Sequence, residues 1–186
     1  MTAAPAAGLA TGRWTVDLAH STATFRVGNL GRTVTGTVPI IEGTVDIDGG
    51  GRPSAVTGAL DLGAIDTGNA RRDKDLRKPG LLDLDRYPTM TFAADTVSVS
   101  PAGWSVSGHL TARGKSVRLA GEAEVSEQDG SATVTARTRL DRRTLGVRAP
   151  RVMIGHAVDI TVTATIRPAP DNAKAFPGQD PQDLSR

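Results

Sequence analysis

The sequence contains no cysteine. A disulfide framework and a thiolate metal site are therefore excluded, because both need cysteine sulfur. Aromatic residues make up only 3% of the chain, so the core must be built from Val, Leu, Ile and Ala rather than from stacked rings. Such a core has few large side chains to fill a wide fold, and it leaves room for a cavity.

Long apolar runs are also missing. No stretch of 18 apolar residues exists, which argues against a transmembrane helix. The N-terminal MTAAPAAGLATGRW has neither a basic region nor a continuous apolar region, so it does not have the pattern of a secretory signal. We therefore expect a cytoplasmic protein, or a periplasmic or secreted one if a signal has been removed.

The sequence also has little excess charge of either sign. It contains 22 basic and 20 acidic residues, so the net charge is only +2. This balance does not indicate a nucleic-acid partner, and we expect none. Basic residues nevertheless bunch at 71–78 and at 137–151, where six arginines accompany Asp141. These segments are either solvated strand faces and loops or a patch that meets a partner or an anionic membrane surface.

Most of the chain alternates apolar and polar residues with period two, the pattern of β-strands with one buried face. Val158 to Ile166 shows it most clearly, and turn signals separate the strands at 49–53, 100–103, 113–115 and 128–130. About eight strands at this spacing predict an antiparallel sandwich or a closed barrel. We expect one folded domain over residues 13–167, with flexible tails at 1–12 and, rich in proline, at 168–186.

One stretch, Ile65 to Phe92, breaks the alternation. Its residues 70–78 have the charge order of a short helix, which Pro79-Gly80 would end. The candidate N-caps are Asp66, Thr67 and Asn69.

This helix can bury little, because Leu76 is its only large apolar side chain. We expect it to cap one end of the barrel, fastened by ion pairs of Arg72 with Asp73 or Asp75. Tyr87 belongs to the same structural cap and precedes a proline that forces the chain to restart in an extended conformation.

Candidate catalytic residues are few. Asp17, His20 and Ser21 offer an acid, a base and a hydroxyl, but adjacent residues rarely reach the geometry of a catalytic triad, and a turn cap is the favoured interpretation. His109 and His156 are single and widely spaced, so they do not form a metal pattern. We predict no enzyme, no metal site and no cofactor.

The remaining candidate site is the interior of a barrel. With eight strands it is near the size at which side chains alone fill the interior or one small ligand is admitted, and both alternatives stay open. A ligand with about ten buried methylenes would gain roughly 8 kcal/mol, which corresponds to roughly micromolar affinity before association costs. The residues expected to line this cavity are Phe25, Val27, Leu60, Leu62, Met90, Phe92, Trp104, Val106, Leu110, Val134 and Ile160.

Four motifs together resemble a known family. They are WTVDLAHSTATFRV at 14–27, IDTGNARRDKDL at 65–76, DLDRYPTMTF at 83–92 and GHLTARGKSVRL at 108–119. In this order they are similar to the YceI-like family of lipocalin-like proteins, over roughly residues 13–167. The resemblance implies an all-β fold, an extended antiparallel eight-stranded β-barrel with a short helical cap. It also implies a long hydrophobic cavity for polyisoprenoid or fatty-acid-like amphiphiles.

Two functions follow from these observations. The leading hypothesis is non-enzymatic binding, transport or storage of a long-chain isoprenoid, such as a polyprenyl chain or an isoprenoid quinone, or of a fatty-acid-like lipid. The alternative is a ligand-free interaction or stress-protection module that uses its arginine-rich surface at 137–151 to bind a partner or an anionic membrane. A transient contact with a membrane surface and a homodimer are both left open.

Overall fold

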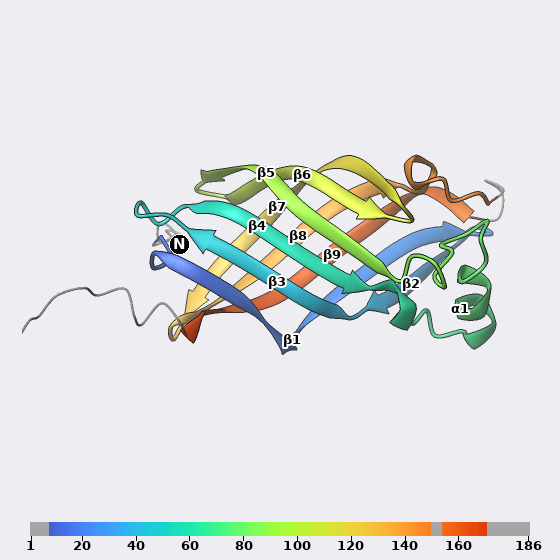
Figure 1. Ribbon diagram of the computed structural model, residues 1–186, viewed down its shortest axis with the longest axis horizontal. Helices are drawn as coiled ribbons and strands as arrows, with labels where there is room; N and C mark the ends of the chain where they lie inside the picture. Colours follow the sequence, from blue (N-terminus) through green and yellow to red (C-terminus); the bar gives the residue numbers. More distant parts are fainter. Residues whose placement is uncertain (1–7, 150–153, 171–186) are drawn as a thin grey trace, which may run out of the picture.

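The computed structural model describes residues 8–149 and 154–170. Within them the chain forms long strands, one short α-helix and two 3₁₀ turns (Figure 1). The strands are β1 (Gly12–Asn29), β2 (Arg32–Val38), β3 (Ile40–Ile47), β4 (Pro53–Asp61), β5 (Thr89–Ser100), β6 (Gly103–Ala112), β7 (Lys115–Gln128), β8 (Ser131–Asp141) and β9 (Ile154–Pro168). The helical elements are η1 (Leu62–Ala64), α1 (Ala70–Leu76) and η2 (Arg142–Leu145).

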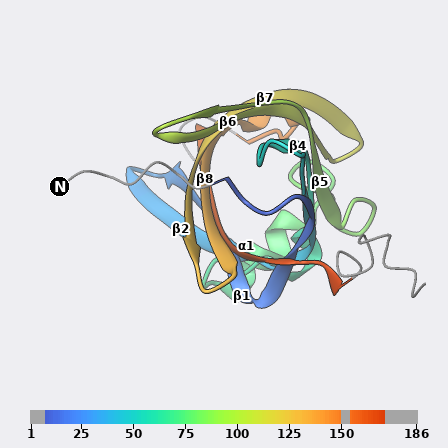
Figure 2. The same ribbon diagram turned by 90° about the vertical axis from the view of Figure 1, so that its left-hand side faces the viewer.

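The strands close into an antiparallel barrel, because β1 pairs with β9 as well as with β2 and β3. The N-terminal part of β1 pairs with β3, and the C-terminal part of β1 pairs with β2. Since only Pro39 separates β2 from β3, the two segments act as one bent strand, and the barrel counts eight. The predicted eight-stranded barrel with a short helical cap is thus confirmed, and Figure 2 shows the strands surrounding one axis.

The first strand bends where the sequence suggested a turn between two strands. The pairing register with β9 shifts between Asp17 and Thr22. At the bend, Asp17 accepts hydrogen bonds from the Ala19 backbone N–H (3.1 Å) and contacts His20 Nδ1 (3.0 Å), while Ser21 Oγ donates to the Asp17 carbonyl (2.6 Å). The hydrogen bond with His20 lowers the pKa of Asp17. The three polar residues therefore shape a bend in a continuous strand.

The insertion between β4 and β5 lies at one end of the barrel, where α1 covers the strand ends (Figure 1). Asn69 is the N-cap, and its side chain accepts a hydrogen bond from the Arg72 backbone N–H at 3.0 Å. The helix ends at Leu76, two residues before the predicted end. No helix among the described residues has the length and apolar character needed to cross a membrane.

Buried apolar side chains form two separate clusters, one toward each end of the barrel. The cluster at the α1 end is rich in leucine, whereas the cluster at the far end contains both tryptophans. The first consists of Val38, Leu62, Leu84, Leu110, Ala112, Leu119, Leu140, Leu145 and Val147. The second consists of Leu9, Trp14, Val45, Ile47, Trp104, Ala123, Ala132 and Ile166.

The folded domain begins before the expected boundary at Arg13. Leu9, assigned to the N-terminal tail, is 4% exposed and packs in the far-end cluster. Trp14 Nε1 donates to the Ala10 carbonyl at 2.9 Å, which holds this segment against the barrel. The prediction of a flexible tail over residues 1–12 was wrong for Leu9. The surrounding Ala- and Gly-rich sequence indicates no structure, but the barrel end buries this one leucine. Residues 1–7 and 171–186 of the predicted tails lie outside the described residues.

Candidate functional site: an apolar cavity in the barrel

Between the two clusters the barrel wall is built from small residues. Gly43, Gly58 and Phe92 follow one another across β3, β4 and β5, since Gly43 pairs with Gly58 and Gly58 with Phe92. A Cβ on Gly43 would collide with Val16 Cγ2, whereas a Cβ on Gly58 would meet only the Glu42 carbonyl at 3.6 Å. The missing side chain of Gly58 therefore leaves space inside the barrel.

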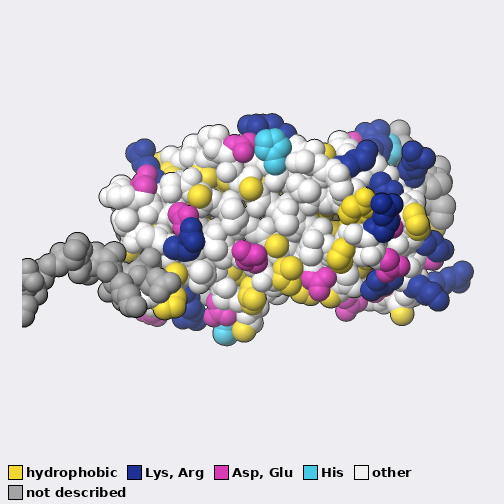
Figure 3. All heavy atoms as spheres, in the orientation of Figure 1, with side chains coloured by type: hydrophobic (Ala, Val, Ile, Leu, Met, Phe, Trp, Pro, Cys, Tyr) yellow, Lys and Arg dark blue, Asp and Glu magenta, His cyan; other side chains and the backbone are white. Residues whose placement is uncertain are grey.

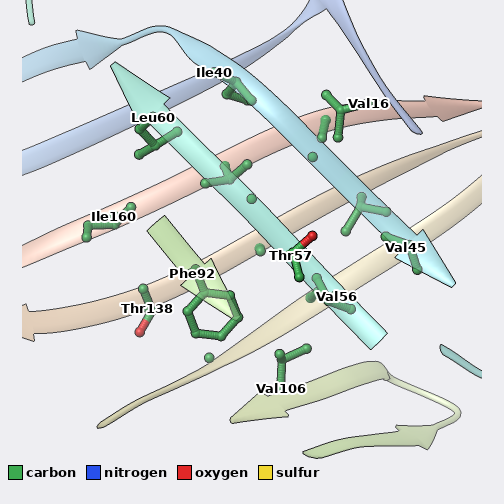
Figure 4. A pocket seen from close by; sticks show the side chains of 18 of the residues that line it. Val16, Ile40, Val45, Val56, Thr57, Leu60, Phe92, Val106, Thr138 and Ile160 are labelled. Atoms are coloured by element: carbon green, nitrogen blue, oxygen red, sulfur yellow. The ribbon is translucent and has the colours of Figure 1, made fainter. Parts of the chain in front are cut away.

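This space is an internal cavity of about 220 Å³ (Figure 4). Val16, Val45 and Val56 line it toward the far end, and Leu60, Phe92 and Ile160 line it toward the α1 end. Its volume lies just below the roughly 300–1,000 Å³ of pockets that hold drug-sized molecules. The cavity can therefore accept a segment of an apolar chain. A longer chain would have to displace side chains of an end cluster.

The cavity offers almost no polar contact. Thr138 lines it, but its hydroxyl donates to the Ala120 carbonyl at 2.6 Å. The charged residues along the wall have exposed side chains: Glu122 accepts a hydrogen bond from Ser105 Oγ at 2.6 Å, and Arg137 pairs with Glu124 at 2.9 Å. An apolar enclosure of this kind stays dry and binds apolar molecules. The described lining residues provide no facing pair of titratable groups for general acid–base chemistry.

Most of the predicted cavity residues lie on the wall. Strand alternation turns them inward from β4, β5, β6, β8 and β9. Trp104 is among them, whereas the second tryptophan, Trp14, is not among the lining residues. The predicted residues on the wall are Leu60, Met90, Phe92, Trp104, Val106, Leu110, Val134 and Ile160.

Three predicted residues, Phe25, Val27 and Leu62, are not among the cavity-lining residues. Leu62 begins η1 and is buried in the α1-end cluster. Phe25 lies across its partner Gly36, where an added Cβ would collide with the ring, and packs against the same cluster. Val27 lies near the end of β1, next to the β1–β2 turn. The alternation predicts which face of a strand points into the barrel. It does not predict where along the barrel axis each of these residues lies.

Several lining residues escaped the sequence analysis. Their side chains are small or absent, so even where they continue an alternating pattern, as Ala164 does, they do not indicate where space remains, and a glycine in a strand is the clearest signal. The register with neighbouring strands is what places them around one space. The missed residues with the smallest side chains are Gly43, Gly58, Ala59, Ala120, Gly121, Ala123, Ala136 and Ala164.

The cap is fastened differently from the expected ion pairs. Thr67 is buried, and both its N–H and its hydroxyl donate to the Asp73 carboxylate. Arg72 donates from Nε to Thr67 Oγ1 (2.8 Å) and from Nη2 to the Thr67 carbonyl (2.7 Å). Arg72 takes part in none of the ion pairs found among the described residues. Instead, Arg72 and Asp73 each form hydrogen bonds with Thr67. Asp75 pairs instead with Lys78 at 2.7 Å, and a hydrogen bond from Lys78 lowers its pKa.

The other two predicted cap residues make apolar contacts. Leu76 packs against the α1-end cluster. The Tyr87 ring lies against Gly114 in the β6–β7 turn, close enough that a Cβ there would be 3.0 Å from Cε1. The Arg86 guanidinium carbon lies 5.3 Å from the Tyr87 ring centroid, within cation–π distance. Tyr87 thus links the insertion to the barrel rim.

Three of the arginines in the segment 137–151 are neutralised by ion pairs. Arg137 pairs with Glu124, Arg139 with Asp159 (2.7 Å) and Arg143 with Asp141. The hydrogen bond from Arg143 lowers the pKa of Asp141 to about 2. Arg151 lies outside the described residues.

Arg142, in the same segment, is 5% exposed and forms none of the close ion pairs found among the described residues. Its guanidinium donates to the carbonyls of Val147, Ala149, Ile154 and Gly155, each at 2.8 Å, and burial lowers its pKa. It therefore holds η2 against the start of β9. Among the described residues, no group of three His, Asp or Glu side chains could hold a metal ion.

A closed antiparallel barrel with an apolar cavity belongs to the class of up-and-down β-barrels that includes lipocalins. The YceI-like domain model matches residues 14–166. The chain therefore belongs to the YceI-like family, and the resemblance in its motifs is confirmed.

Individual relatives agree with this assignment. Protein YceI of Salmonella arizonae is 30% identical over 112 residues, which are 59% of this chain and 58% of that protein. The chain thus spans less than two thirds of this curated relative.

Two solved structures share the fold. BcnA of Burkholderia cenocepacia has a TM-score of 0.72 at 18% identity, covering 81% of this chain and 98% of the other. A polyisoprenoid binding domain of Saccharophagus degradans, implicated in plant cell wall breakdown, has a TM-score of 0.65 at 15% identity, covering 84% and 98%.

Proposed function

We propose that this protein binds the hydrocarbon chain of a lipid in its barrel cavity and carries or stores it without chemical change. The observation that supports this most is the space of about 220 Å³ inside the barrel, lined almost entirely by carbon and positioned between two apolar clusters. A long-chain isoprenoid or a fatty-acid-like amphiphile is the ligand class we favour. The polyisoprenoid-binding domain of the same fold supports the isoprenoid over other apolar molecules.

A long chain can be accommodated through residues shared between the cavity and the α1-end cluster. Leu60, Met90, Phe92 and Ile160 line the cavity and are also only partly buried against that cluster. Side chains that are not locked in a close-packed core can change rotamer at low cost, and methionine adapts most readily. We infer that the chain lies along the barrel axis and extends from the cavity toward the α1 end.

The experiment is lipid binding by a cavity-filling variant and its neighbour. Purified protein is extracted with solvent and measured by native mass spectrometry, before and after incubation with farnesol, geranylgeraniol or palmitic acid. Gly58→Leu places a side chain in the cavity, whereas Ala93→Leu adds to the neighbouring strand β5 at an exposed position that is not among the lining residues. We expect Gly58→Leu to weaken binding about tenfold or more, since a leucine side chain displaces several buried ligand methylenes, and Ala93→Leu to bind like the parent.

A fluorescence titration gives a second readout. Trp104 lines the cavity and Trp14 does not, so a Trp14→Phe variant reports from the cavity alone. We expect its emission to shift on lipid addition and to saturate. Absence of any saturable binding by all three lipids, with no co-purifying lipid, would overturn the proposal.

A further inference from the structure

The two ends of the barrel differ in charge. The described connections at the α1 end are residues 29–32, 61–89, 112–115 and 141–149, and they hold twelve Lys and Arg against seven Asp. Those at the far end are 8–13, 46–53, 100–103, 127–131 and 167–170, with three Arg against four Asp and Glu. The α1 end therefore has a formal excess of five positive charges. Figure 3 shows Lys and Arg side chains gathered over that end.

Several acidic residues at the α1 end already have partners within the same end of the barrel. Asp75 pairs with Lys78 and Asp85 with Arg77, while Asp73 accepts from Thr67. Several exposed cations are left that form no ion pair among the described residues, and they come from four separate connections. These cations are Arg32, Arg71, Lys74, Lys115 and Arg148.

A leucine is exposed on the same end. Leu30 lies at the tip of the β1–β2 hairpin and is 64% exposed, the largest fraction among the exposed large apolar residues described. It has φ +48° and is followed by Gly31 at φ +74°, the conformation of a type I′ turn. Asn or Asp is the usual first residue of such a turn, because a positive φ disfavours most side chains.

The far end provides a direct comparison. The β7–β8 turn has Asp129 at φ +50° and Gly130 at φ +75°, so it repeats the geometry with the preferred Asp-Gly. Neither turn geometry nor core packing explains leucine at position 30. A residue that contradicts its local conformation points to a role outside the fold.

We propose that the α1 end is a docking surface for an anionic phospholipid bilayer, with Leu30 inserted among the lipids and the exposed cations against the headgroups. Clustered Lys and Arg attract anionic lipid surfaces, and an exposed apolar side chain beside them adds burial in the interfacial layer. Cations distributed around one barrel end suit a flat, extended partner. The proposal goes beyond lipid binding in the cavity. Vesicles that contain no free isoprenoid or fatty acid test it separately.

The first test is co-sedimentation with vesicles of phosphatidylcholine alone and of phosphatidylcholine mixed with phosphatidylglycerol. We expect pelleting with the anionic vesicles only. Partitioning should fall by about tenfold or more when salt is raised to ~1 M, where the Debye length is about 3 Å. Equal binding to neutral vesicles, or binding that ignores salt, would contradict electrostatic docking. Failure to pellet with anionic vesicles, combined with retention on heparin, would assign the surface to an acidic polymer and overturn the proposal.

The second test uses variants at the two ends. Leu30→Asn places a favoured residue in the turn, so we expect an unchanged or higher melting temperature together with about tenfold weaker vesicle binding. Arg71→Glu with Lys74→Glu should weaken binding by a similar factor. Val99→Asn and Arg52→Glu make matched changes at the far end and should bind like the parent. Parent-like binding by both α1-end variants would refute the docking surface.

Discussion

At the scale of single residues, Arg142 shows how this barrel uses a buried charge. Its guanidinium donates hydrogen bonds to four backbone carbonyls. Without it these carbonyls would be acceptors with no donor away from water. Arginine suits this position because its planar group carries five donors and stays protonated. The residue fastens η2 and the carbonyls of Val147 and Ala149 to the start of β9 through hydrogen bonds.

We expect Arg142→Met to lower the free energy of unfolding by about 3 kcal/mol or more, because it leaves buried carbonyls without donors. Chemical denaturation followed by circular dichroism measures this loss. Arg143→Met, which removes an exposed pair with Asp141, is the control and should cost less than about 1 kcal/mol. Similar losses in both variants would show that burial of Arg142 contributes little.

At the scale of elements, the cap is a structural insertion. Thr67 joins the loop before α1 to the helix, since Arg72 and Asp73 of α1 both bind this one residue. Asp66 adds a pair of backbone hydrogen bonds to Thr37, which attaches the insertion to the free edge of β2. The insertion therefore covers the edge of β2 that, among the described residues, pairs with no other strand.

Arg72→Ala and Asp73→Ala should each lower stability by about 1–3 kcal/mol, because each removes hydrogen bonds to a buried residue. Hydrogen exchange should rise most in residues 65–88, since the loss is local. Arg71→Ala changes an exposed neighbour on the same helix and should leave both measurements unchanged. An unaltered melting temperature in the first two variants would contradict the fastening role of Thr67.

At the scale of the whole molecule, the barrel is plugged at both ends by side chains and open between them. A ligand that fills the middle would connect the two clusters and so stabilise the complete fold. Its effect on stability then depends on its concentration relative to its dissociation constant. The charge difference between the ends adds a direction to this otherwise cylindrical shape.

A bound lipid should raise the melting temperature of the parent protein. At a concentration of about 100 times the dissociation constant the gain is roughly 2.7 kcal/mol, or about 5–11 °C for a domain of this size. Differential scanning calorimetry with and without geranylgeraniol measures the shift. Gly58→Leu, with its cavity filled, should show little or none. An equal shift in this variant would place the binding site elsewhere.

The sequence predicted the fold well where side chains repeat with a strict period. The alternation in Val158 to Ile166 and the glycine turns indicated the antiparallel strands. It predicted α1 with Asn69 among the caps because capping is a local interaction. It divided β1 at Asp17 to Ser21, since a bend inside one strand has the same polar residues as a turn between two.

Local chemistry by itself thus determined which residues face inward in the regular strands, where the glycine turns lie and that the core has few large rings. Only the tertiary structure decided where a cavity remains, because a space depends on which small residues meet across strands, as Gly43 and Gly58 do. It also decided that cations from four connections share one end of the barrel with Leu30. Contacts between residues distant in the chain are set by strand register and barrel closure, and no local pattern records them.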